Sequence, residues 1–296
     1  MDPESFTDNM NKVELAKKLQ AGYSGGRFNL TGVDLSHLNL AGCDLRDSNL
    51  SGTDFSFCNL SGAKLQGCNL KGANFTHTVI VGATMVIAKI SGVPIGNVNH
   101  TLFRGSSLQG ADFSFAKIEK ADFVNTELQN CQFENTFIRE CEFGRADLAK
   151  SNLSNSELQN CEFSGVSARL LSASKCSFLN CAFTSADLEN ADFINCEFNN
   201  CLFSSTYLNG SKFRHVRFTD CDFNQCKGNV MEMLCNQFTR VSFDNASMEN
   251  STWDDCDFQQ VHFRQASLDK AKIRGNCSST DFQGATGKFV VDGTDV

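Results

Sequence analysis

Large apolar residues recur every five positions through most of this chain. They run in one phase from Leu30 to Ile95, shift by three residues, and continue from Phe103 to Ile273. An amphipathic helix repeats its apolar residues every three or four positions and a strand every two, so a period of five fits neither element. The pattern instead predicts a short extended piece followed by a turn, with the large apolar residue facing inward.

A period of twenty contains the shorter period. One residue in every twenty is phenylalanine at Phe103, Phe123, Phe143, Phe163, Phe183, Phe203, Phe223, Phe243 and Phe263. A fixed period means that equivalent residues stack in successive copies of one structural unit. Four steps of five residues therefore predict a coil with four sides, and residues 25–275 predict about twelve coils.

A small residue lies two positions before each large one, as Ala63 and Ala73 do before Leu65 and Phe75. We expect the small side chain to face inward as well, because the axis of such a coil is crowded. Asn, Asp, Ser and Gly follow the large residues, and these residue types favour turns. The coil is therefore expected to consist of short β-segments and turns.

Segments such as 41–50 (AGCDLRDSNL) and 186–193 (ADLENADF) contain the motif of a small residue, Ala or Cys, followed by Asp and then by Leu or Phe. This motif resembles that of the pentapeptide-repeat proteins, and the resemblance covers about residues 28–275. It implies an all-β fold, a right-handed quadrilateral β-helix, to which we add a short N-terminal capping α-helix. It implies no particular activity, because members of this family serve many roles.

Three regions are expected. Residues 1–24 are the N-terminal tail and capping helix, residues 25–275 are the β-helix with a phase slip at 96–102, and residues 276–296 are a C-terminal cap or tail. Caps are expected because the open end of a coil exposes apolar side chains and unpaired backbone groups.

The N-terminal helix is expected over residues 5–21, with Gly22 as its stop signal. Its apolar residues recur at a spacing that favours one inward stripe. The residues of that stripe are Phe6, Met10, Val13 and Leu19.

Fifteen cysteines raise the question of a disulfide or metal site, but thirteen of them fall at the small inward position. Free cysteine packs as a small apolar residue, and no histidine or carboxylate shares the inward positions to complete a metal site. So many unpaired thiols favour a reducing compartment. Cys235 and Cys277 are off register and are expected to be the more exposed thiols. One column of the inward set comprises Cys141, Cys161, Cys181, Cys201 and Cys221.

Three segments interrupt the repeat: 96–102, 168–173 and 226–236. Ala168 and Ala173 shrink two inward positions while Leu171 enlarges a third, which suggests conserved volume. At Gly228 the inward side chain is lost. Because loops carry binding residues more often than scaffolds do, the first segment is a candidate binding loop, with Gly96, Asn97, Asn99 and His100 as its residues.

The net charge is −8, and residues 101–200 hold 14 acidic against 8 basic side chains. A basic footprint for nucleic acid is therefore absent. The five histidines are scattered at outward or turn positions, and no phosphate-binding glycine loop appears. The sequence predicts no catalytic residues, no metal and no cofactor, so we do not expect an enzyme.

The function expected from these features is a rigid, non-enzymatic scaffold that binds another protein. Units such as Cys141-Glu-Phe143 and Cys201-Leu-Phe203 resemble repeats of the quinolone-resistance branch, so one alternative is a DNA-mimicking protein that binds topoisomerase (gyrase). A targeting or effector module of a bacterial protein is another. No apolar run of about 18 residues predicts a membrane span, and the start lacks a secretory pattern. We therefore expect a cytoplasmic protein that contacts neither nucleic acid nor membrane directly. The sequence does not predict its oligomeric state.

Overall fold

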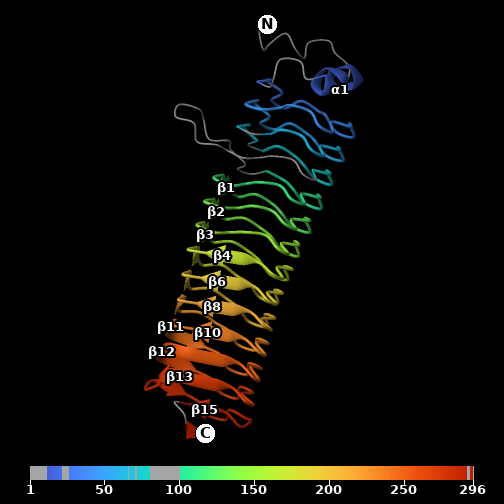
Figure 1. Ribbon diagram of the computed structural model, residues 1–296. Helices are drawn as coiled ribbons and strands as arrows, with labels where there is room; N and C mark the ends of the chain where they lie inside the picture. Colours follow the sequence, from blue (N-terminus) through green and yellow to red (C-terminus); the bar gives the residue numbers. More distant parts are fainter. Residues whose placement is uncertain are drawn as a thin grey trace. The chain divides into compact units, whose positions relative to one another are not determined.

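The computed structural model describes residues 12–21, 27–65, 67–70, 72–80, 101–291 and 294–295. The chain divides into two compact units, Met1–Asn152 and Leu153–Val296. We call them the first and second units. Both are built from the same four-sided turn, and within each unit successive turns lie directly on one another (Figure 1). The predicted β-helix is thus confirmed as a parallel β-solenoid with a single short helix near its N-terminus, among the described residues.

The step around Phe123 shows how five residues make one side of the coil. Asp122 faces outward and forms parallel bridges with the layers on both sides. Phe123 faces inward, and its N–H donates to the Glu142 carbonyl of the next layer at 2.7 Å. Asn125 turns the corner with φ of 55°, in the left-handed region that asparagine tolerates well. The Thr126 N–H closes the turn on the Phe123 carbonyl at 3.1 Å.

Bridges between residues twenty apart set the register in both units. The break falls between residues 80 and 101, because Asn74 pairs with Leu102 rather than with residue 94. The phase slip predicted at 96–102 stays a prediction, because residues 96–100 lie outside the described residues, while Thr101 and Leu102 pair as in a regular coil. The predicted count of about twelve coils is not confirmed, since it included residues 81–100, which lie outside the described residues.

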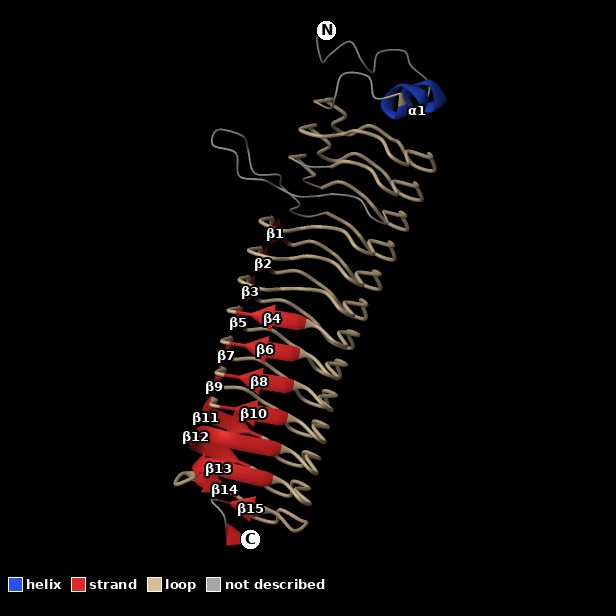
Figure 2. Ribbon diagram, viewed as in Figure 1, coloured by secondary structure: helices blue, strands red, loops and turns tan. Residues whose placement is uncertain are grey.

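Extended strands are short and concentrate in the second unit (Figure 2). The first unit holds α1 (Lys12–Gln20), β1 (Lys117–Glu119) and β2 (Phe137–Arg139). The second unit holds β3 (Glu157–Gln159), β4 (Ser172–Ser174), β5 (Ser177–Leu179), β6 (Asp192–Ile194), β7 (Glu197–Asn199), β8 (Lys212–Arg214), β9 (Arg217–Thr219), β10 (Glu232–Leu234), β11 (Gln237–Ser242), β12 (Thr252–His262), β13 (Lys272–Asn276), β14 (Thr280–Asp281), β15 (Val290–Val291) and β16 (Thr294–Asp295).

These strands form two neighbouring sides of the second unit. One side is the parallel column β3, β5, β7, β9 and β11, and the other is β4, β6, β8 and β10. Strand β12 is long enough to serve both columns, because it pairs with β10 and with β11. The last added strand, β16, is antiparallel to β15.

The capping helix was predicted in the right region, but its inward stripe was partly wrong. Helix α1 buries Leu15, Ala16 and Leu19, while Val13 is 59% exposed. Its ends are tied to the first coil by polar contacts, for example from the Gln20 amide to the Asn39 carbonyl at 2.6 Å. Phe6, Met10 and Gly22 lie outside the described residues. No helix in the described part of the chain is long and apolar enough to cross a membrane.

The interior consists of stacked rings. All nine phenylalanines of the twenty-residue period are at most 2% exposed. In the second unit, the rings of Phe203 and Phe223 stack with centroids 4.4 Å apart, and Phe198 meets Phe203 edge-to-face at 5.3 Å. Both arrangements are favourable for aromatic pairs. The layer spacing of about 4.8 Å in parallel strands therefore also sets the spacing of the rings.

Irregular steps conserve volume inside the coil. Leu171 is buried beside the small Ala168 and Ala173. At Gly228, an added Cβ would lie 3.2 Å from the Met231 sulfur, so the Met231 side chain occupies the space that the glycine leaves. Methionine suits such a gap because it is unbranched and flexible.

The final coil is shorter than the others. Strand β12 pairs with β13 through a register shift between Trp253 and Cys256, and Cys256 lies opposite Gly275. A Cβ at Gly275 would fall 1.9 Å from the Cys256 carbonyl oxygen, and the glycine φ is 134°. Only glycine fits this approach, which shifts the following residues so that His262 pairs with Asp281.

Candidate functional site

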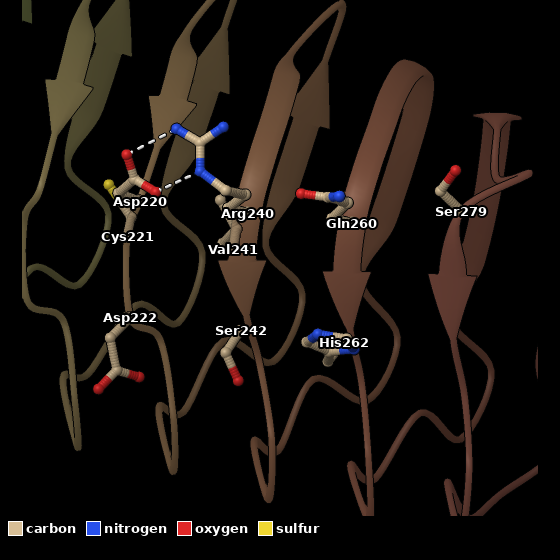
Figure 3. A pocket seen from close by; sticks show the side chains of 9 residues that line it. All are labelled: Asp220, Cys221, Asp222, Arg240, Val241, Ser242, Gln260, His262 and Ser279. Atoms are coloured by element: carbon tan, nitrogen blue, oxygen red, sulfur yellow. Dashed lines mark hydrogen bonds and ion pairs between the residues drawn. The ribbon is translucent and has the colours of Figure 1, made fainter.

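A shallow groove of about 650 Å³ crosses the outside of the second unit next to the shortened coil (Figure 3). Its lining comes from four successive layers. Residues 220–222 follow β9, residues 240–242 belong to β11, Gln260 and His262 belong to β12, and Ser279 precedes β14. Equivalent positions of the repeat therefore form two parallel rows of side chains.

The first row begins with a tightly held ion pair. Arg240 Nε and a terminal nitrogen donate to the two carboxylate oxygens of Asp220 at 2.5 and 2.7 Å. The guanidinium hydrogen bonds lower the pKa of Asp220 below its usual value, and the carboxylate raises that of Arg240. Such a bidentate pair fixes both side chains in orientation. The N-terminal half of the groove, formed by residues 220–222 and 240–242, therefore carries an ion pair whose charges neutralise each other.

The second row contains the residue types of a hydrolytic triad: Asp222, Ser242 and His262. A working triad needs the serine proton directed at the histidine and the histidine oriented by the acid. Here the Ser242 hydroxyl donates to the Asn224 amide oxygen at 2.6 Å. His262 Nδ1 lies 3.9 Å from Asp281, beyond hydrogen-bond distance. The three groups thus stand in line without forming a proton relay.

The C-terminal half of the groove is lined by Gln260, His262 and Ser279. Gln260 and Ser279 are exposed. His262 Nδ1 is shielded from water, has no hydrogen bond among the described residues and faces a carboxylate oxygen of Asp281 at 3.9 Å.

The inward thiols are built into the core. Cys131 and Cys201, for example, are fully buried, and each donates to a main-chain carbonyl at 3.1 to 3.5 Å. Burial raises the pKa of Cys131 and Cys226 to about 12. Neutral, enclosed thiols are poor nucleophiles and poor metal ligands. Within the described ranges no group of three or more His, Cys, Asp or Glu could hold a metal ion.

Many outward carboxylates have a structural task. Asp122 Oδ1 accepts the Val124 N–H at 2.9 Å, and Asp222 Oδ1 accepts the Asn224 N–H at 2.8 Å. This is the Asx-turn, and it explains why Asp and Asn recur just before the large apolar residue. The second oxygen of Asp122 accepts from Arg104 of the neighbouring layer at 2.9 Å. The acidic surface is thereby partly neutralised.

Of the residues singled out from sequence, Cys221 alone lines the groove, where its buried side chain lies behind the two rows. The candidate loop residues Gly96, Asn97, Asn99 and His100 lie outside the described residues. The side chains of the phenylalanine and cysteine columns are buried inside the coil. The thiols of Cys235 and Cys277 are half-buried.

Two outer features were missed, although both follow the period of twenty. The first is the groove row of Asp220, Arg240 and Gln260. The second is a ring column in the first unit, where Phe57 stacks on His37 with centroids 4.9 Å apart and lies at a tilt against His77 with centroids 5.1 Å apart. Aligning outward positions at this spacing would have revealed both.

Comparisons with known proteins agree with the repeat. A family model described as pentapeptide repeats matches in eight copies over residues 29–67, 53–92, 97–125, 126–165 and 172–200, which is more than half of the chain. A second model, described as a pentapeptide repeat region, matches residues 195–273. No curated protein sequence matches the chain.

Several solved structures are similar in part. A trypsin-treated variant of QnrB1, a plasmid-mediated fluoroquinolone resistance protein, is 17% identical over 61% of this chain and 90% of its own, with a TM-score of 0.34. HetL, a protein involved in regulating heterocyst differentiation in the cyanobacterium Nostoc, is 15% identical over 97% of this chain and 100% of its own, with a TM-score of 0.20. A pentapeptide repeat protein of the Arabidopsis thaliana thylakoid lumen is 23% identical over 42% and 68%, with a TM-score of 0.22.

Those scores lie below 0.5, so the assignment rests on the repeat and on the matching family models. Five-residue steps, inward Leu and Phe, and Asx-turns that precede them recur through both units. The chain belongs to the family of pentapeptide-repeat proteins.

Proposed function

We propose that this protein is a non-enzymatic scaffold that binds another protein through the outer sides of its coils. The observation that carries the proposal is the cross-linking of outward side chains between layers. Arg217 pairs with Glu197 of one layer and donates to Gln237 of the next at 3.2 Å. Side chains held in place before binding lose less conformational entropy on association.

The groove supports a binding role over a catalytic one. The Ser242 hydroxyl is engaged by Asn224, and the Asp220 carboxylate by Arg240. Neither group is directed at a position where a substrate atom could be attacked, and the geometry of nucleophile and base comes first in such an assignment. Recognition by fixed polar groups needs no such relay.

The topoisomerase-binding alternative depends on an outer surface that resembles DNA in charge. Several carboxylates of the second unit are instead paired, as Asp187 is with Arg169 and Asp192 with Arg214, both at 2.5 Å. This pairing favours a general protein scaffold over a DNA mimic. A supercoiling assay of gyrase, with and without a quinolone, tests the alternative directly. Nothing in the described residues favours the effector alternative.

The scaffold proposal is tested by capture followed by reconstitution. The full-length chain is immobilised, proteins retained from an extract of the native cell are purified, and each is titrated against the chain by calorimetry. We expect at least one saturable complex of fixed stoichiometry with a dissociation constant at or below the micromolar range. The proposal would be overturned if none of the retained proteins bound the chain after purification. It would also be overturned if the chain converted a small molecule that co-purifies with it into a product.

A further inference from the structure

We propose that the second unit binds a second copy of this chain through the corner of its coil that carries Asn160, Asn180 and Asn200. These residues, which we call the asparagine corner, directly follow β3, β5 and β7 in three successive layers (Figure 2). They belong to the row that continues with Asp220 in the groove. The inference goes beyond the scaffold function and does not depend on it.

The three side-chain amides form a ladder along the corner. Asn180 Nδ2 donates to Asn160 Oδ1, and Asn200 Nδ2 donates to Asn180 Oδ1, both at 2.9 Å. A carboxamide has two N–H donors and two acceptor positions on its oxygen. Within the part of the chain that the structure describes, Asn180 uses one of each in the ladder. It therefore keeps one donor and one acceptor for a partner.

The surroundings of the ladder are apolar. Asparagine tolerates the positive φ of a corner, here 52° to 55°, but that preference does not explain the residues beside it. Leu179 directly precedes Asn180 and is 37% exposed, and Leu202 follows Asn200 by two positions and is 45% exposed. Ala182 lies next to Leu202 in the same row. The asparagine corner is thus a strip of amides with apolar side chains on both flanks.

The charged groups that border this strip are already engaged within the protein. Asp220, at the next corner of the row, is held by Arg240. Glu162, one layer before Ala182, accepts the Ser164 N–H at 2.7 Å. Removing charges from water is costly, and a contact confined to the asparagine corner avoids that cost. An uncharged partner surface therefore fits it best.

The spacing of the ladder indicates what kind of partner this is. The amides repeat at the layer spacing of about 4.8 Å, whereas a single extended segment laid along the corner presents the same side only every second residue, at about 6.6 Å. Another stack of parallel strands has the matching spacing. A second copy of this chain supplies that spacing together with the same unused donors and acceptors. Identical patches that pair in this way form an isologous, two-fold contact.

The hydrogen bonds of the ladder also select the orientation of the second copy. Two amides that each keep one donor and one acceptor can bond to each other twice, in a cyclic pair. Because the ladder donors point towards the preceding layer, the two-fold axis of such pairs is perpendicular to the coil axis, and the two copies run antiparallel. With Asn180 on the two-fold axis it meets Asn180 of the second copy, while Asn160 meets Asn200 of the second copy.

This register is favoured over its neighbours. A shift by one layer would leave two amide pairs in place of three. The chosen register also brings Leu179 opposite Leu179 of the second copy, which removes two exposed apolar side chains from water. The contact is small compared with the roughly 1,200 Å² buried by stable interfaces, so we expect a weak dimer with a dissociation constant between about 10 µM and about 1 mM.

Sedimentation equilibrium of the full-length chain, from about 10 µM to about 1 mM, tests this inference. We expect a monomer–dimer equilibrium without larger species, because a two-fold contact is closed. Asn180→Asp places two like charges opposite each other on the axis and should raise the dissociation constant at pH 7 by about tenfold or more. Leu179→Ser leaves the ladder intact and should raise it by about threefold or more, because it removes apolar contact area.

The matched controls lie at a different corner of the same unit. Asn250→Asp adds the same charge at an exposed position with φ of 58°, and Val230→Ser removes an apolar side chain that is 62% exposed. Both should leave the dissociation constant unchanged. Fluorescence of Trp253, the only tryptophan, verifies that all four variants fold. Because the contact is uncharged, added salt should change the dissociation constant little.

Several results would overturn the inference. They are a chain that stays monomeric up to about 1 mM, assembly beyond the dimer, a dimer that N180D and N250D weaken equally, and a dimer that added salt dissociates. None of these results bears on the scaffold function, which is tested by the capture of a different protein. A captured protein that binds the monomeric N180D variant as tightly as the unsubstituted chain would show that the two contacts are separate.

Discussion

Phe55 and Phe57 lie two residues apart in one coil of the first unit, one inside and one outside. Phe55 is fully buried and stacks on Phe75 with centroids 4.9 Å apart. Phe57 is 54% exposed and stacks on His37 at the same distance of 4.9 Å. The layer spacing imposes the same ring separation on both sides of the backbone. Burial is what distinguishes the two columns.

The two positions also differ in backbone conformation. Phe57 turns the corner with φ of 57°, a region that disfavours bulky residues. Most other corners of the described coils carry Asn, Gly or another polar residue. The outer column therefore combines stacking, which is favourable, with a strained backbone, which is not. Outer columns can vary with little effect on stability, and this freedom leaves them available for recognition.

The largest effect is expected inside the coil. Phe55→Ala should lower the free energy of unfolding by roughly 3–5 kcal/mol, because it removes buried contacts and leaves a cavity. Urea unfolding followed by far-UV circular dichroism measures the change. Phe55→Leu is the control, since Leu35 fills the same column one layer away, and it should cost less than about 1.5 kcal/mol. Equal losses in both variants would contradict the cavity explanation.

The next largest effect is expected at Gly275, where the final coil is shortened. Gly275→Ala should cost roughly 1–3 kcal/mol, because the new Cβ would overlap the Cys256 carbonyl and nothing flexible can move away. Trp253 fluorescence during urea unfolding reports on this unit. At Gly210 an added Cβ meets only the end of the Asn190 side chain, which can move, so Gly210→Ala should cost less. A larger loss at Gly210 would argue against the close approach at Gly275.

A smaller effect is expected at the capping helix. Lys12 donates to Ser36 at 3.1 Å and lies 2.5 Å from an Asp34 oxygen. The Lys12 hydrogen bond, with that of Ser36, lowers the pKa of Asp34 from 3.8 to about 2. Because the folded pKa is depressed, the stabilisation of the helix is present above pH 4 and is lost as the pH falls towards 2.

Hydrogen exchange of α1, corrected for intrinsic rates, measures this loss. Lys12→Met should speed exchange in the helix at pH 7 and make much less difference at pH 2, where about half of the Asp34 carboxyl groups are protonated. A difference that persists unchanged at pH 2 would mean that Lys12 holds the helix by its aliphatic stem alone.

The smallest effect is expected outside the coil. Phe57→Asn removes the outer stacking, worth about 0.5–1.5 kcal/mol, but relieves a backbone strain of about 1–2 kcal/mol. The net change in unfolding free energy should therefore stay within about 1 kcal/mol of zero. The same urea titration measures it. A loss as large as that of Phe55→Ala would mean that Phe57 is part of the structural core.

The fold could be predicted closely because the period of five specifies which side chain faces inward at every step. Phe123 and Cys141 were assigned to the interior from register alone, and both are buried. The groove was not predicted, because the period of five leaves the residue types at outward positions unrestricted and only an alignment at the period of twenty shows its rows. The role of His262 depends on the register shift at Gly275, which arises from one close backbone contact. Val13 was misassigned for a similar reason, since the docking of α1 and not its own pattern decides which side is buried.

The most direct test of the contrast between inside and outside is the difference between the unfolding free energies of Phe55→Ala and Phe57→Ala, measured side by side in urea. The two substitutions remove the same side chain from columns with the same ring spacing. We predict that Phe55→Ala is the more destabilising by at least about 2 kcal/mol. Equal destabilisation by the two substitutions would show that stacking, not burial, holds the coil together.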